Sequence, residues 1–192
     1  MPALTPKEAL GLFQKGFRSG DRYREYTKAD DDRLAGRIPD VMRMILQKDG
    51  WCSYREQIFW MCDPDDWTQA ARAWFPKSKS PQVLGRSSFG ELFVLDEIFW
   101  LTLPHQSVVM KEVHDRNWFF AETLTSKTFM LKTELPNHRA ARAKAGPLEW
   151  DEMYTHVPAL ALGGSVKTSK VERVKAREQL VILSQLAPIR RR

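Results

Sequence analysis

Three short apolar runs in the middle of the chain constrain its fold most strongly. They are ELFVLD (91–96), IFWLTL (98–103) and SVVMKEV (107–113), and each has the length and composition of a β-strand. Asp96-Glu97 and Pro104-His105 stand between them at positions suited to turns. Strands joined by such short connections pair antiparallel, so these runs predict a β-meander.

Helix signals lie on both sides of this meander. Thr5, Pro6 and Glu8 form a capping box that predicts a helix start. A second helix is expected from Pro39, with Gly50 directly after its end. The fold class predicted is therefore α+β, a central and mostly antiparallel sheet with helices at the N- and C-terminal ends.

Other segments complete this prediction. The run Ile58–Cys62 indicates a buried strand, and Asp63-Pro64 directly after it has the residues of an N-cap and a first helical position. The polar residues 18–37 indicate a loop or a surface that faces a partner. Further helices are expected at 118–133, 138–145 and 176–186.

Composition limits the classes of function. The apolar share of 43% is enough for a sizeable core, and no window is apolar enough to span a membrane. The formal charge is +6, but the surplus lies in the C-terminal third, whereas residues 51–134 contain more acidic than basic side chains. Cys52 and Cys62 are expected as reduced thiols. Since the start of the chain lacks signal-peptide features, a cytoplasmic protein is expected.

Motifs for catalysis and for cofactors are weak. The four histidines are scattered without zinc-site spacing, and His138 is expected to face solvent on a helix. GRSSFG is not a nucleophile elbow, and ALGGSV is not a phosphate loop, so Gly163-Gly164 predicts a turn instead. We expect no metal, no cofactor and no small-molecule substrate.

One stretch, GPLEWDEMYTHVPALALGG (146–164), keeps two interpretations open. Asp151, Glu152, Tyr154 and His156 would supply acids and bases for an enzyme. The alternative is scaffold, in which the carboxylates pair with arginine or cap a helix. The neighbouring question of aromatic residues is simpler, because Trp60, Phe93, Phe99 and Trp100 stand in apolar runs, which favours core packing over a base-stacking surface.

Five segments occur in order along the chain: IPDVMRMILQKDGW (38–51), IFWMCDPDDW (58–67), LGRSSFGELFVLDE (84–97), GPLEWDEMYTHVPALALGGSV (146–166) and LVILSQLAPI (180–189). The residues that carry the pattern are Asp63, Pro64, Trp67, Gly85, Arg86, Phe89, Gly90, Leu92, Gly146, Leu148, Asp151, Glu152, Tyr154, Pro158, Ala159, Leu160, Leu162, Gly163 and Gly164. Together the segments resemble the GAD-like family of bacterial proteins, which includes immunity proteins against type VI secretion effectors of the DNase type.

This resemblance implies a binding protein and not an enzyme. Such a protein binds a secreted nuclease toxin in a 1:1 complex and occludes its active site or its DNA-binding surface. A nuclease presents cations to phosphates, so carboxylates of the inhibitor would meet it. The expected toxin contacts are Asp63, Asp65, Asp66, Glu91, Asp96 and Glu97. The expected structural motif residues are Arg86, Phe89, Gly90, Asp151, Glu152, Tyr154, Gly163 and Gly164.

The expected organisation has three parts. Residues 1–116 form a GAD-like part with the meander, residues 117–189 form a helical block packed on it, and residues 190–192 form a basic tail. An alternative function is a nucleic-acid-binding or regulatory module, with weak DNA contact through the C-terminal cations. These are Lys167, Lys170, Arg173, Lys175, Arg177 and Arg190–Arg192.

Overall fold

A computed structural model describes residues 4–96, 98–112, 117, 119–123, 137–166 and 170–191. Glu97, Lys167, Arg192 and most of the helix expected at 118–133 lie outside these residues. The helices are α1 (Pro6–Gly16), α2 (Lys28–Leu34), α3 (Asp40–Asp49), α4 (Thr68–Trp74), η1 (Pro104–Gln106), η2 (Phe119–Thr123), α7 (His138–Ala145), η4 (Leu160–Leu162) and α8 (Ala176–Leu186). The strands are β1 (Ser19–Arg24), β2 (Trp51–Tyr54), β3 (Phe59–Met61), β4 (Gln82–Ser87), β5 (Leu92–Asp96), β6 (Ile98–Leu103), β7 (Val108–Glu112), β8 (Glu152–Val157), β9 (Lys170–Lys175) and β10 (Arg190–Arg191).

The described strands form one large sheet and one small one. The large sheet has the order β1-β2-β3-β4-β5-β6-β7-β10, and β8 pairs with β9 in a separate hairpin. Within the large sheet the neighbours are antiparallel except β10, which runs parallel to β7. The predicted meander is confirmed as β5, β6 and β7, and with it the predicted α+β class.

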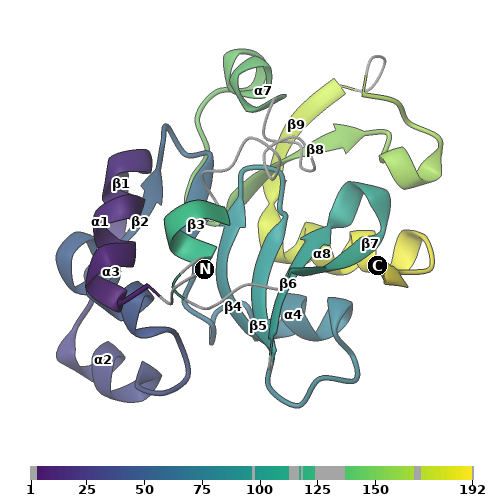
Figure 1. The fold of residues 1–192 in the computed structure, drawn as a ribbon. Helices are drawn as coiled ribbons and strands as arrows, with labels where there is room; N and C mark the ends of the chain where they lie inside the picture. The colour runs from purple at the N-terminus through teal and green to yellow at the C-terminus, as the bar shows by residue number, and fades with distance from the viewer. Residues whose placement is uncertain are drawn as a thin grey trace.

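Both faces of the large sheet are covered, as Figure 1 shows, with α1 and α3 on one side and α4 and α8 on the other. The alternation along β5 follows this arrangement. Phe93 and Leu95 pack in the core with α1 and α3, whereas Leu92 and Val94 pack with α4 and α8. A strand buried on both faces is apolar at every position, which explains the unbroken run LFVL.

The first two predicted helices are confirmed with their ends. Thr5 caps α1 with its side chain, which accepts from the backbone N–H of Glu8 while the Glu8 carboxylate accepts from the Thr5 backbone. Helix α3 begins at Asp40 and ends before Gly50, whose φ of +71° suits glycine. The third helix begins later than predicted. Asp63 to Trp67 form a turn, and α4 starts at Thr68.

The loop predicted at 18–37 is wrong, because these residues form β1 and α2. Strand β1 is an exposed edge strand, so its sequence lacks the alternation that marks a half-buried strand. Helix α2 begins with a second capping box, in which Thr27 and Asp30 exchange hydrogen bonds. Aspartate takes the place of the usual glutamate in this box.

The C-terminal part contains more strand than predicted. Helices α7 and α8 are confirmed at 138–145 and 176–186, but the hairpin β8–β9 lies between them, so this part is not purely helical. Arg190 and Arg191, predicted as a tail, pair with Val108 and Val109 as the last strand of the large sheet. In the part of the chain that is described, no helix has the length and hydrophobicity needed to cross a lipid bilayer.

Candidate functional site

The turn RSSFG (86–90) is the point where the two sheets meet. Arg86 is fully buried, and its guanidinium lies over the rings of Trp60 and Trp67 at 5.1 and 5.5 Å from the ring centroids. It donates to the carbonyls of Ser87 and Trp150 at 3.1 and 2.7 Å. Burial lowers the pKa of Arg86 to about 10, so the side chain is still a cation at neutral pH. Arg86 therefore joins β4 to the segment before β8.

Two serines of the same turn hold buried polar partners. Ser87 donates to the Glu91 carboxylate across the turn, and Ser88 donates to Nδ1 of His138 at 2.9 Å. Nε2 of His138 then donates to the carbonyl of Glu56 at 3.0 Å, which fixes the tautomer. His138 is only 2% exposed, so its predicted place in solvent is wrong. Burial lowers the pKa of His138, which keeps the ring neutral at pH 7.

Strand β8 docks on this turn. The backbone N–H of Tyr154 donates to the Ser88 carbonyl at 2.8 Å, and the Tyr154 hydroxyl donates to the Gly146 carbonyl at 2.6 Å. Phe89 packs against the ring of His156, with centroids 5.7 Å apart and nearly parallel planes. His156 and Tyr154 are both buried. These side chains form packed interior and do not line an open acid–base site.

The acidic residues before β8 have partners within the fold. Asp151 accepts from Lys175 of β9 at 2.8 Å, and its carbonyl accepts from the first backbone N–H of α8. Glu152 accepts from the backbone of Glu149 at 3.0 Å. The turn expected at the glycine pair is present at Gly163, which has a φ of +88° at the end of η4. The chemistry shown by this stretch is structural pairing.

The turn between β2 and β3 has an unusual backbone. Arg55, Glu56 and Gln57 all have positive φ angles, of 49°, 58° and 73°. Each non-glycine residue in this region costs about 1–2 kcal/mol, so the turn persists only because other groups hold it. Arg142 of α7 donates to the Gln57 side chain at 2.6 Å and to the Glu56 carbonyl at 3.1 Å. The C-terminal part thus fixes a strained turn of the N-terminal part.

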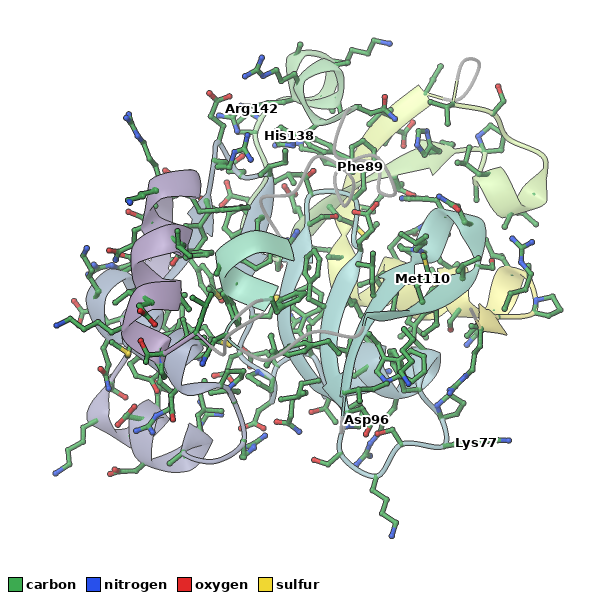
Figure 2. The ribbon with its side chains drawn as sticks, viewed as in Figure 1. Lys77, Phe89, Asp96, Met110, His138 and Arg142 are labelled. Atoms are coloured by element: carbon green, nitrogen blue, oxygen red, sulfur yellow. The ribbon has the colours of Figure 1, made fainter. Side chains whose placement is uncertain are left out.

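A cleft of about 750 Å³ opens beside this turn, between the end of α1, strand β1 and helix α7. We call it the basic cleft, because its charged side chains are mostly cations: Lys15, Arg18, Arg55, Arg139 and Arg142 against Asp21 and Glu56. Among the residues that the structure describes, none of these five cations forms an ion pair with a carboxylate. Figure 2 shows His138 and Arg142 together at this end of the molecule. The cleft is a site with unneutralised positive charge.

The predicted acidic contacts Asp63, Asp65 and Asp66 lie in an ion-pair network. Asp63 is buried, with its side chain 3% exposed, and pairs with Arg24 and Arg33. Its carboxylate is therefore not available to a partner, which corrects that prediction. Asp65 and Asp66 remain at the surface, with side chains 45% and 36% exposed.

The arginines of this network neutralise the surface carboxylates. Asp65 pairs with Arg33 and with Arg37, the latter at 2.6 Å. The Arg37 hydrogen bond lowers the pKa of Asp65. Asp66 lies 3.8 Å from Arg24, and its pKa is raised by burial and by the neighbouring Asp63. This region therefore carries little net negative charge.

The other predicted contacts separate in the same way. Glu91 is 1% exposed and lies under the RSSFG turn, so it too is not available to a partner. Asp96 is half-buried at the turn between β5 and β6, and Figure 2 shows it at the opposite end of the molecule from Arg142. Glu97 lies outside the described residues. The six predicted contacts do not form one continuous surface.

The C-terminal cations proposed for DNA are mostly engaged within the fold. Arg173 donates to the Pro147 carbonyl at 2.7 Å, and Lys175 pairs with Asp151. The guanidinium of Arg177 lies 5.4 Å from the centroid of Trp150. Arg190 donates to the Gln106 carbonyl at 2.9 Å, and Arg191 lies over the rings of Phe75 and Trp100. Lys170 is exposed.

Two family models together span most of the chain. Residues 9–107, just over half of it, match the model of the GAD-like domain. Residues 115–187 match the model of the C-terminal part of type VI secretion system (T6SS) immunity protein Tdi1. This chain belongs to the GAD-like family of type VI immunity proteins. In this family member the basic cleft lies between the two matched segments, since α1, β1 and the strained turn belong to the first and α7 to the second.

A solved structure shows the same fold as this GAD-like protein. It is the crystal structure of Atu4351 from Agrobacterium tumefaciens, with a TM-score of 0.74 and 17% sequence identity. The similarity covers 93% of this chain and 89% of that one. Among curated proteins, none matches this chain.

Reasoning from the sequence missed the basic cleft. Its cations come from α1, the β2–β3 turn and α7, so no short motif contains them. A signal was nevertheless present in Arg139 and Arg142, which stand on one face of a correctly predicted helix. No cluster of His, Cys, Asp or Glu within the described ranges has the arrangement of a metal site.

Proposed function

We propose that this immunity protein acts in the cytoplasm, where it binds a DNase effector in a 1:1 complex and occludes its active site or its DNA-binding surface. The observation that carries the proposal is the pair of family matches, in which a GAD-like domain is followed by the C-terminal part of an immunity protein. The resemblance of the motif segments to proteins that counter DNase effectors supports the nuclease target. The protein itself is then an inhibitor and not an enzyme.

The buried histidines and carboxylates support this non-enzymatic role. Ser88 and His138 form a hydrogen-bonded pair, but both side chains are buried and the second histidine nitrogen donates to a backbone carbonyl. Tyr154 and His156 are interior residues as well. An inhibitor needs a rigid surface, and this polar interior supplies it by joining β8 and α7 to the RSSFG turn.

Co-expression with the toxin encoded beside this gene tests the proposal. We expect growth rescue, a 1:1 complex by size-exclusion chromatography with light scattering, and loss of plasmid cleavage by the purified toxin. Growth rescue without a complex would contradict inhibition by binding. A complex that still cleaves DNA would contradict occlusion, and a toxin without nuclease activity would contradict the DNase target.

A further inference from the structure

The basic cleft is a surface that neither the fold nor the buried polar network requires to be cationic. Lys15, Arg18, Arg55 and Arg139 are exposed, and among the described residues they have no carboxylate partner. Like charges gathered around one hollow repel each other, which destabilises the fold slightly. The arrangement becomes favourable when an anion enters. The cleft volume of about 750 Å³ lies in the range of ligand-binding sites.

We infer that the basic cleft is the docking site for an acidic, extended segment of the effector. This inference rests on the proposed function, because it names the surface and the chemistry of the partner. The effector segment would place its Asp and Glu side chains against Arg18, Arg139 and Lys15. Opposite charges of this kind steer association and set the orientation of the complex.

The edge strand β1 favours a polypeptide over a nucleic acid. In the described part of the chain β1 pairs with β2 alone, and it is the first strand of the large sheet. Ser19, Gly20 and Asp21 of this strand are exposed and line the cleft. An edge strand presents unpaired backbone N–H and C=O groups, and an extended peptide can pair with them.

The remaining lining residues also disfavour nucleic acid. Proteins that hold single strands interleave their cations with exposed aromatic rings on which bases stack. The cleft lining contains no Phe, Tyr or Trp, and its one ring, His138, is buried. The carboxylates of Asp21 and Glu56 in the same lining would repel a continuous phosphate backbone. A peptide can avoid both by placing neutral residues there.

The strained turn keeps the cleft in shape before binding. Arg142 bonds to Gln57, and Gln57 in turn donates to Asp21 at 2.9 Å and accepts from the backbone of Leu148 at 2.9 Å. These bonds tie β1, the turn and the C-terminal part together around the cleft. A preformed site loses less conformational freedom when the partner binds.

Charge reversal tests the inference with a matched control. The cleft variant is Arg18→Glu with Arg139→Glu, and the control is Lys77→Glu with Lys79→Glu. The four side chains are exposed, and Figure 2 shows Lys77 at the opposite end of the molecule from Arg142. Both double variants change the net charge equally, so they differ only in the place of the change. Circular dichroism and thermal unfolding would verify that both variants are folded.

The first probe is a short fluorescein-labelled poly-glutamate peptide at low salt. We expect the cleft variant to bind it about tenfold or more weakly than the wild type, and the control variant to bind within about twofold. Equal weakening by both variants would overturn the cleft as the site. A single-stranded oligonucleotide that binds the cleft more tightly than the peptide would overturn the choice of a polypeptide.

The second probe is the co-expressed effector itself. We expect the cleft variant to associate with it about tenfold more slowly, with the control unchanged. If both variants bind the effector as the wild type does, the inference is wrong while the proposed function stands. If the wild type binds no effector but retains the peptide through the cleft, the proposed function fails, and the cleft is an acidic-peptide site for another partner.

Discussion

Single buried residues explain why carboxylates that are conspicuous in the sequence have different roles in the fold. Asp63 and Asp65 are separated by one residue, yet the side chain of Asp63 is 3% exposed and that of Asp65 is 45% exposed. Both pair with Arg33. A buried ion pair that loses one partner leaves an uncompensated charge in the interior, whereas water replaces the partner of an exposed one.

Replacing these two residues gives a direct comparison. We expect Asp63→Asn to lower the free energy of unfolding by about 3 kcal/mol, because Arg24 and Arg33 lose a buried anionic partner. Asp65→Asn should lower it by less than about 1 kcal/mol. Urea unfolding measures both. Equal effects would contradict the burial of Asp63, and a loss of effector binding by folded Asp63→Asn would restore it as a contact.

The neutral state of His138 links stability to pH. Its pKa is lowered in the folded protein, mainly by burial and further by Arg142 and Arg139, although the Glu56 side opposes this. The unfolded chain therefore binds a proton more readily, starting near the ordinary pKa of about 6.5. The stability from neutral His138 is complete above that pH and is lost as the pH falls toward the lowered pKa.

The variant His138→Gln tests this link, because an amide hydrogen-bonds without titrating. We expect the wild type to lose stability between about pH 7 and pH 5, and the variant to lose less over the same interval. Urea unfolding at a series of pH values measures this. Carboxylates titrate mainly below this interval, so parallel pH profiles for the two proteins would contradict the role of His138.

At the scale of elements, the RSSFG turn depends on a glycine where β5 begins and β8 and α8 approach. Gly90 has a φ of +81°, and a Cβ there would lie 2.6 Å from Cε of Met153 and 3.2 Å from Cδ2 of Leu180. Alanine is disfavoured both by the backbone conformation and by this contact. The close approach is what brings the hairpin against the large sheet.

We expect Gly90→Ala to lower the free energy of unfolding by about 2 kcal/mol or more. The control is Gly11→Ala in α1, where no atom lies within 4 Å of the new Cβ and φ is not positive. That change should stabilise the protein by about 0.5–1 kcal/mol, because glycine is unfavourable inside a helix. Thermal and urea unfolding of the pair would show opposite shifts. Destabilisation by both would contradict the argument.

At the scale of the whole molecule, the sequence predicts the parts of the fold that depend on local patterns. The meander, the capped helices α1 and α3, and helix α8 each combine a periodic apolar pattern with clear ends. Strand β1 is exposed, and strand β9 shows an apolar residue at every third position, so neither has the alternation of a strand. Their structure comes from pairing with distant segments, which no local pattern records.

The site was less predictable for the same reason. The carboxylates of Asp63 and Glu91 look available in the sequence, but arginines and a serine from other segments enclose them. The basic cleft needs α7 to be placed beside β1, and that placement depends on Arg142 reaching a turn 85 residues earlier in the chain. Only the assembled fold brings these charges together.

The same assembly bears on DNA binding by the C-terminal cations. Arg173 and Lys175 are occupied by Pro147 and Asp151, and Arg177 lies against Trp150. Each phosphate contact contributes about one unit to the slope of log K against log salt. Cations already bonded within the protein contribute less than this. The sequence alternative of a DNA-binding C-terminal surface therefore makes a prediction about that slope.

We expect the double variant Arg173→Ala with Lys175→Ala to change the slope by clearly less than one unit, measured by fluorescence anisotropy with duplex DNA. A change of about two units would mean that both side chains contact phosphates, and the DNA-binding alternative would then stand. Lys170→Ala is the internal comparison, because this lysine is exposed on the same hairpin. If it alone alters the slope, the hairpin touches DNA only at its tip, which is too little to hold a duplex at physiological salt.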